Sequence, residues 1–157
     1  MRFSYPYHTE QHENSIVVDF PDVPGALTEV REDENAAQII NDCLMAALGG
    51  YIKAKKTPPS PSDLLGRPCV TLDLVTSAKL ALAMTMSEQQ VSNVELARNL
   101  RVNEKVVRRL LDPDHRCRID RLEDALHHLG LCLELKVRRN HSTDWKELQG
   151  TLSPDPI

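Results

Sequence analysis

The basic side chains between residues 101 and 121 are the group with the clearest chemistry in this sequence. This stretch holds seven basic residues against four acidic ones. Lys105, Arg108 and Arg109 are spaced so that all three face outward on one helix. In a DNA major groove, Arg and Lys side chains donate hydrogen bonds to O6 and N7 of guanine. The pattern therefore favours recognition of double-stranded DNA, and the alternative is a plain helical hairpin with a solvated basic face.

The segment that must position these side chains, residues 93–111, has the pattern of two short helices joined by a tight turn. We expect Asn93 to cap the first helix and Asn103 to cap the second, with Arg101 and Val102 in the turn. The apolar residues expected to face the core are Val94, Leu96, Ala97, Leu100, Val106, Val107, Leu110 and Leu111. This pattern predicts a helix-turn-helix whose second helix enters the major groove. The expected DNA-binding residues are Asn93, Asn103, Glu104, Lys105, Arg108, Arg109, Arg116 and Arg118, the last two at phosphates.

The flanking segments predict two further helices. Residues 75–84 carry Leu80, Ala83 and Met84 at helical spacing, and a turn at residues 112–114 ends the preceding helix. Asp120 is expected to cap a last helix that Gly130 closes. The inward residues of that helix would be Leu122, Ala125, Leu126 and Leu129. Apolar residues then alternate along residues 131–137, a segment that either pairs as a strand with a second copy of the chain or packs back on the helices.

The charge of the chain is distributed unevenly. Residues 1–66 carry 5 basic and 10 acidic groups, a net charge of −5, whereas residues 67–138 carry 12 and 10, a net charge of +2. The asymmetry fits an acidic part for a basic partner and a second part for a polyanion. The four cysteines lack Cys-x-x-Cys spacing, there is no signal-peptide pattern, and no apolar run reaches the roughly 18 residues of a membrane span. We expect a cytoplasmic protein without membrane association.

The first part of the sequence predicts strands followed by one helix. The predicted strands are residues 1–8, 15–22 and 26–32, separated by a polar loop at 9–14 and a turn at 23–25. Gly25 is expected to take a positive φ in that turn. A helix is predicted from Glu34 to Lys55, with Asp33 available as its cap. The buried stripe of this helix would consist of Ala37, Ile40, Leu44, Ala47 and Leu48.

Prolines mark the boundary between the two parts. Pro58, Pro59 and Pro61 forbid continued helix and give a stiff connector. Residues 68–75 alternate as a strand does, and this strand could close either part. The expected organisation is a first module at 1–57, completed or not by strand 68–74, a linker at 58–66, a helical module at 67–138 and a mobile tail at 139–157.

Two motifs in the first module carry a family resemblance. The run from Val17 to Thr28, with Phe20-Pro21-Asp22 followed by Pro24-Gly25, resembles the strand-turn-strand signature of HicB antitoxins. Asn35-Ala36-Ala37 near the helix start and the prolines at 58–61 match the same pattern. Together with the helix-turn-helix pattern, residues 1–138 resemble a HicB antitoxin of the DNA-binding type. In that pattern Arg101 stands where many members place Gly, so Arg101 or the residue beside it must tolerate a strained turn.

The resemblance implies an α+β fold: an N-terminal β-β-β-α-β partial ribonuclease H-like module and a C-terminal all-α helix-turn-helix domain. It also implies a partner, a small basic HicA-type toxin that cleaves mRNA and is blocked by the antitoxin. The DNA-binding domain would repress the operon of the pair as a dimer, or within a tetramer or larger assembly with toxin. The residues expected to attract the toxin are Asp19, Asp22, Glu29, Glu32 and Asp33.

The same acidic residues raise the question of catalysis. A two-metal nuclease needs several carboxylates that converge on the metal ions, and Asp19, Asp22 and Glu29 alone are too few in a module of this length. His127 and His128 are adjacent on a predicted helix and point in different directions, which disfavours a shared metal. We therefore expect no catalytic site, no metal and no cofactor. The leading hypothesis is an antitoxin that also represses transcription; the alternative is a stand-alone helix-turn-helix regulator with a ligand-sensing N-terminal module.

Overall fold

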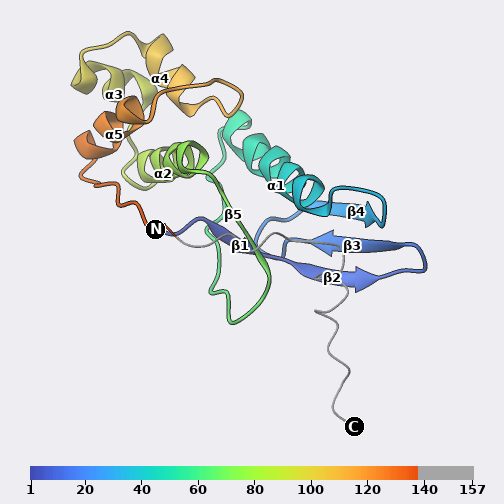
Figure 1. The fold of residues 1–157 in the computed structure, drawn as a ribbon. Coiled ribbons are helices and arrows are strands. Elements are labelled where there is room, and N and C mark those ends of the chain that lie inside the picture. The colour runs from blue at the N-terminus through green and yellow to red at the C-terminus, as the bar shows by residue number, and fades with distance from the viewer. Residues whose placement is uncertain (138–157) are drawn as a thin grey trace. The chain divides into compact units, whose positions relative to one another are not determined.

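The computed structural model describes residues 1–137, so the predicted mobile tail at 139–157 lies outside the described part of the chain. The fold is mixed α+β, with five helices and two small antiparallel sheets within those residues (Figure 1). The chain forms two compact units. The sheet unit contains Ser4–Ala47 and Ser60–Thr71, and the helical unit contains Met1–Phe3, Leu48–Pro59 and Leu72–Lys136. No helix among the described residues is long and apolar enough to cross a membrane.

Five short strands build the sheet unit. The three-stranded sheet has the order β2-β3-β4, and the two-stranded sheet pairs β1 with β5. The strands are β1 (Ser4–Pro6), β2 (His8–Gln11), β3 (Ser15–Asp19), β4 (Leu27–Arg31) and β5 (Cys69–Thr71). The first predicted strand is therefore two strands with different partners, which meet at Tyr7, whose main-chain N–H donates to the oxygen of Pro68 at 3.0 Å.

The predicted polar loop at residues 9–14 is wrong in its first half. Thr9, Glu10 and Gln11 belong to β2 and pair with β3, so only residues 12–14 form the hairpin turn. β2 lies at the edge of its sheet, and its residues are half-buried or exposed. An edge strand with so little burial does not require apolar residues, and its polarity hides it in the sequence. The predicted positive φ of Gly25 is confirmed, at +90°.

The core of the sheet unit is built from every second residue of its strands. Ile16, Val18 and Val30 are buried on one face of the sheet, and the helix α1 (Ala36–Lys53) contributes Ile40 and Leu44 to the same compact unit. Ala37, expected in this stripe, is exposed, and Ala36 is buried instead. The expected cap Asp33 is also wrong, because Asn35 Oδ1 accepts the N–H of Gln38 at 3.2 Å.

The strand predicted at residues 68–75 is shorter in the structure. β5 ends at Thr71 because Asp73 caps the next helix, α2 (Leu74–Glu88): its carboxylate accepts the N–H of Thr76 at 3.0 Å. Leu74 therefore begins a helix rather than ending a strand. β5 pairs with β1 through Ser4 and Thr71, so it belongs to the sheet unit.

Four helices form most of the helical unit: α2, α3 (Asn93–Leu100), α4 (Glu104–Leu111) and α5 (Ile119–His128). Their buried residues, together with Leu129 directly after α5, include Leu80, Leu82, Met84, Leu96, Ala97, Val107, Leu110, Leu122, Ala125 and Leu126. The inward face expected for α5 is confirmed, and Gly130 follows it with a φ of +81°. Two expected core residues are wrong, since Val94 is 53% exposed and Val106 38% exposed. Leu100 and Leu111 are half-buried.

Two of the expected helix caps are displaced. α3 is capped by Ser92, whose Oγ accepts the N–H of Glu95 at 3.2 Å, so Asn93 is the first helical residue. Ser92 and Asn93 are both good caps, and the sequence alone does not distinguish them. α5 begins after Arg118 with no side-chain cap, and Asp120 lies inside its first turn. Asn103 is confirmed as the cap of α4, accepting the N–H of Lys105 at 2.8 Å.

Residues 131–137 form neither a helix nor a strand in the structure. Leu131 and Leu133 are half-buried, whereas Leu135 and Val137 are 73% and 84% exposed. The alternation seen in the sequence therefore does not produce one covered face along the whole segment.

Candidate functional site

The turn between α3 and α4 sets the geometry of the two helices. Arg101 ends α3 in the left-handed conformation, with φ 55° and ψ 40°. The N–H of Val102 returns to the oxygen of Ala97 at 2.9 Å, which closes the last turn of α3. The strained turn expected at Arg101 or the residue beside it is confirmed, and it lies at Arg101. A β-carbon in this conformation costs free energy, so the surrounding contacts must hold the turn in place.

α4 directs its basic residues away from the core. Val107 and Leu110 are buried, while Lys105, Arg108 and Arg109 are exposed on the remaining surface. Arg108 is tied to its own helix, because its Nη2 lies 2.9 Å from Glu104 Oε1 and its Nε donates to the same oxygen at 2.9 Å. Within residues 1–137, Lys105 and Arg109 have no ion-pair partner. Of the expected contact residues on α4, these two are therefore the ones with free charges.

The remaining expected DNA-binding residues differ in what they already bind. Asn103 uses its side-chain oxygen as the cap of α4, and Asn93 is half-buried at the start of α3. Arg118 forms an ion pair with Asp120, with 2.8 Å between Nη2 and Oδ2. Arg116 is exposed and has no ion-pair partner among the described residues. Arg116 directly follows the segment 112–115, and a buried lysine donates hydrogen bonds to the main chain of that segment.

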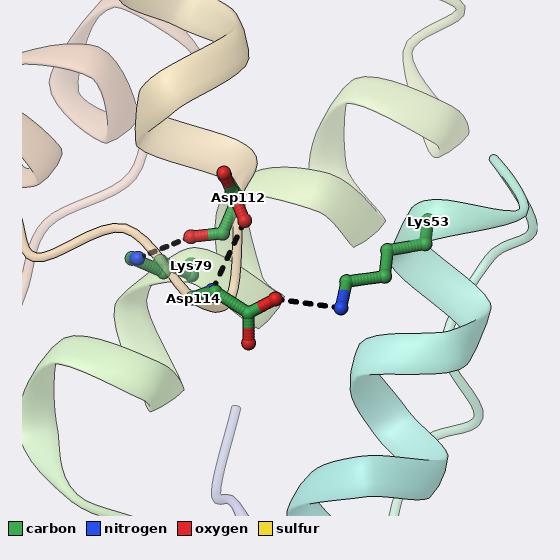
Figure 2. Close-up of polar contacts among 4 residues, drawn as sticks. All are labelled: Lys53, Lys79, Asp112 and Asp114. Carbon is green, nitrogen blue, oxygen red and sulfur yellow. Dashed lines mark hydrogen bonds and ion pairs between the residues drawn. The ribbon is translucent and has the colours of Figure 1, made fainter.

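That lysine is Lys79 of α2, which is 3% exposed. Its ammonium donates to the main-chain oxygens of Asp112 and His115, and the first of these contacts is drawn in Figure 2. Lys79 was not among the residues predicted to have a role, because a single lysine in an amphipathic pattern is expected on the solvated side. No local pattern indicates its burial, because the two acceptors lie 33 and 36 positions further along the chain.

One face of the three-stranded sheet consists of exposed and half-buried residues in the described part of the chain. The strand register places His8, Asp19 and Leu27 in one row across β2, β3 and β4, and Glu10, Val17 and Glu29 in the next. We call these six residues the open sheet face; all are exposed or half-buried. His8 Nδ1 lies 3.8 Å from Asp19 Oδ2, and Leu27 is 64% exposed. The structure thus brings the expected residues Asp19 and Glu29 together and adds Glu10, which the sequence placed in a loop.

The other expected acidic residues lie elsewhere. Asp22 Oδ2 accepts two hydrogen bonds from Ser62, one from the main-chain N–H at 2.8 Å and one from the Oγ hydroxyl at 2.9 Å. Asp22 therefore holds Ser62 in place within the sheet unit. Burial, and secondarily the charge of Asp22, raise the pKa of the nearby Tyr5 phenol. Glu32 and Asp33 are exposed in the turn after β4. Within residues 1–137, no three His, Cys, Asp or Glu side chains converge as a metal site would require.

Comparison with known proteins gives a consistent group of relatives. The chain is 35% identical over 131 residues to "Antitoxin HicB 2" of Photorhabdus laumondii subsp. laumondii, covering 83% of this chain and 94% of that protein. It is 30% identical over 141 residues to "Antitoxin HicB" of Pseudomonas fluorescens, covering 86% and 94%. It is 27% identical over 128 residues to "Antitoxin HicB" of Escherichia coli strain K12, covering 81% and 93%. No family model matches the chain.

Proposed function

We propose that this chain, which belongs to the HicB antitoxin family, neutralises a small basic ribonuclease toxin of the HicA type and represses its own operon. The antitoxin role follows from the family, and the two binding activities are our assignment. The observation that carries the DNA-binding half is the pair α3–α4, with Lys105 and Arg109 exposed on α4 and free of acidic partners among the described residues. The protein would act in the cytoplasm.

In the proposed DNA complex, α3, the turn and α4 act as a helix-turn-helix. α4 enters the major groove, and α3 crosses the backbone, as helices in this motif do. Lys105 and Arg109 would contact base edges, while Arg116 and Arg118 would contact phosphates beyond the end of α4. A homodimer would place two such helices in successive major grooves about 34 Å apart, so the operator would be a palindrome.

In the proposed toxin complex, the acidic side chains of the open sheet face attract a basic partner. Glu10, Asp19 and Glu29 supply negative charge there, and the exposed Leu27 supplies apolar contact area. Charge complementarity of this kind raises the association rate and orients the partners. Bound toxin would be inhibited because its active surface is covered, with no chemistry by the antitoxin.

One experiment tests both halves. The purified chain is titrated against a duplex from the promoter upstream of its own coding sequence, and separately against the small basic protein encoded beside it, with mRNA cleavage as the readout. We expect nanomolar-range operator binding at physiological salt and loss of cleavage at stoichiometric antitoxin. Operator binding without any effect on the neighbouring protein would replace the proposal with the stand-alone regulator.

A further inference from the structure

The last turn of α1 and the residues after it belong to the helical unit rather than to the sheet unit. Three contacts hold them there. A β-carbon on Gly49 would lie 3.4 Å from Cγ of Pro113, so this helix approaches the 112–115 segment closely. Lys53 forms an ion pair with Asp114, marked in Figure 2, with 2.6 Å between Nζ and Oδ2, and Thr57 Oγ1 lies 2.6 Å from Ser87 Oγ. The main chain from residue 49 to residue 57 is therefore fixed on the four-helix core.

Two lysines lie between these contacts. Lys55 has a φ of 54°, and its N–H donates to Ile52 at 3.0 Å, while the N–H of Lys56 donates to Tyr51 at 2.9 Å. This left-handed residue closes α1 and defines where both side chains leave the main chain. Both lysines are exposed, and neither has an acidic partner among the described residues. Lys53 differs, because its hydrogen bond with Asp114 and the charge of that carboxylate raise its pKa.

Lys55 and Lys56 line one groove together with the elements of the candidate DNA site. The groove has a volume of about 890 Å³, and its wall includes Asn93 and Val94 of α3 and Arg108 of α4. The acidic residues in its wall are all engaged: Glu104 with Arg108, Asp114 with Lys53, and Asp112 with the N–H of Asp114. Asp112 keeps its negative charge, but the basic side chains in the wall outnumber the acidic ones, and Lys55 and Lys56 are its two cations without an ion-pair partner among the described residues.

We propose that Lys55 and Lys56 bind phosphates of the same duplex that α4 enters, so that the DNA-binding surface extends back to the end of α1. This inference rests on the proposed function. The first helix of a helix-turn-helix crosses the DNA backbone, so groups that share a groove with the start of α3 lie beside phosphates. Lysine suits that contact because its ammonium acts as a point charge and sets little demand on geometry.

The occupant of this groove is DNA rather than an acidic protein segment, because the groove is continuous with α4. Arg108 lines it from one side, and the next residue, Arg109, is exposed on the surface assigned to DNA bases. A protein segment bound there would compete with the operator. A duplex would instead neutralise Lys55 and Lys56 together with the basic residues of α4 and of residues 116–118.

The test is the salt dependence of operator binding by the full chain with Lys55→Gln and Lys56→Gln. Each lost phosphate contact lowers the slope of log K against log salt by about 0.9, so the double variant should lose about 1.8. Its affinity in 0.1 M salt should fall at least tenfold, as roughly follows from that slope. The matched control, Arg2→Gln with Arg31→Gln, removes the same charge from exposed positions outside the groove and should leave the slope unchanged.

The outcomes separate this inference from the proposed function. If the wild-type chain fails to bind the promoter duplex, the proposed function itself is wrong. If the wild type binds, Lys105→Gln with Arg109→Gln abolishes binding, and the Lys55/Lys56 variant keeps the wild-type slope, only the present inference is overturned. A Lys55/Lys56 variant that no longer binds the toxin but binds the operator as the wild type does also overturns this inference, and it assigns the groove to a protein partner.

A second measurement uses the unaltered protein and does not depend on the folding of a variant. Acetylation of exposed lysines by a water-soluble ester is followed by mass spectrometry, with and without the promoter duplex. Lys55 and Lys56 should be protected by the duplex at least several-fold, and Lys136, exposed and outside the groove, should not be. Equal acetylation of Lys55 and Lys56 with and without DNA would contradict the inference.

Discussion

The ammonium of Lys79 donates a hydrogen bond of 2.5 Å to the main-chain oxygen of Asp112. Figure 2 shows this contact; a second hydrogen bond reaches the oxygen of His115, and both acceptors are uncharged carbonyl groups. Moving an ammonium out of water is costly unless hydrogen bonds replace its hydration. The contact therefore joins α2 to the segment that ends α4 and leads to Arg116 and Arg118, and it makes the position of that segment depend on α2.

Replacing Lys79 with Met tests that dependence. Met has similar length and no donor, so the oxygen of His115 loses the lysine and that of Asp112 keeps only the N–H of His115 at 3.2 Å, while the packing volume is largely kept. We expect the free energy of unfolding to fall by about 1–3 kcal/mol, the usual cost of unsatisfied buried groups. Urea denaturation measures this change, and Lys79→Ala, which also leaves a cavity, should cost more. A Met variant as stable as the wild type would mean that burial of the charge costs as much as its hydrogen bonds supply.

Arg101→Gly should stabilise the protein. Arg101 has a φ of 55°, where glycine has no β-carbon to clash, so the substitution removes strain of roughly 1 kcal/mol. The gain will be smaller than that, because glycine also increases the entropy of the unfolded chain. The matched control is Arg98→Gly in α3, which should destabilise by about 1 kcal/mol because that residue is helical. Thermal unfolding that moves in the same direction for both variants would contradict the account of the turn.

Lys105 and Arg109 should contribute more to operator recognition than Arg108. Each of the two is exposed and free of an acidic partner within the described residues, whereas Arg108 is held by Glu104 at 2.9 Å. Lys105→Ala and Arg109→Ala should each weaken operator binding by about 1–3 kcal/mol and relax the preference for one base pair. Toxin neutralisation should be unchanged in both variants, which is measured in the mRNA-cleavage assay. An Arg108→Ala variant that loses more affinity than either would show that the Glu104 pair opens on binding.

Arg116→Gln should have a different signature. This residue lies beyond α4 and is expected at a phosphate, so its loss should weaken binding to operator and to unrelated duplexes alike. The slope of log K against log salt should fall by about 0.9. A loss confined to the operator sequence would move Arg116 to the bases.

The sequence predicted the helical unit better than the sheet unit, for physical reasons. The inward residues of α5 and the caps at Asn103 and Gly130 follow local rules that a single segment satisfies on its own. The strand β2 could not be found in this way, because Glu10 and Gln11 owe their conformation to pairing with Val17 and Ile16. Lys53 and Asp114 meet across 61 positions of the chain, and no local pattern indicates such a contact. For the same reason, the sequence did not indicate that residues 48–59 belong to the helical unit, because the contacts that place them there are with residues far along the chain.

Charge on the open sheet face should control toxin association. Glu10 on β2 and Glu29 on β4 both pair with Val17 of the central strand, and both are exposed. The double variant Glu10→Lys with Glu29→Lys therefore reverses the charge of this row and leaves the core unchanged. We expect the association rate with the basic toxin to fall at least tenfold at low salt and to approach the wild-type rate as salt rises, since the attraction is electrostatic. Stopped-flow mixing measures both rates. Asp22→Asn is the contrasting variant: its carboxylate binds Ser62, so it should lower the free energy of unfolding and leave the association rate nearly unchanged. Equal association rates for the charge-reversed and wild-type chains at low salt would place the toxin on another surface.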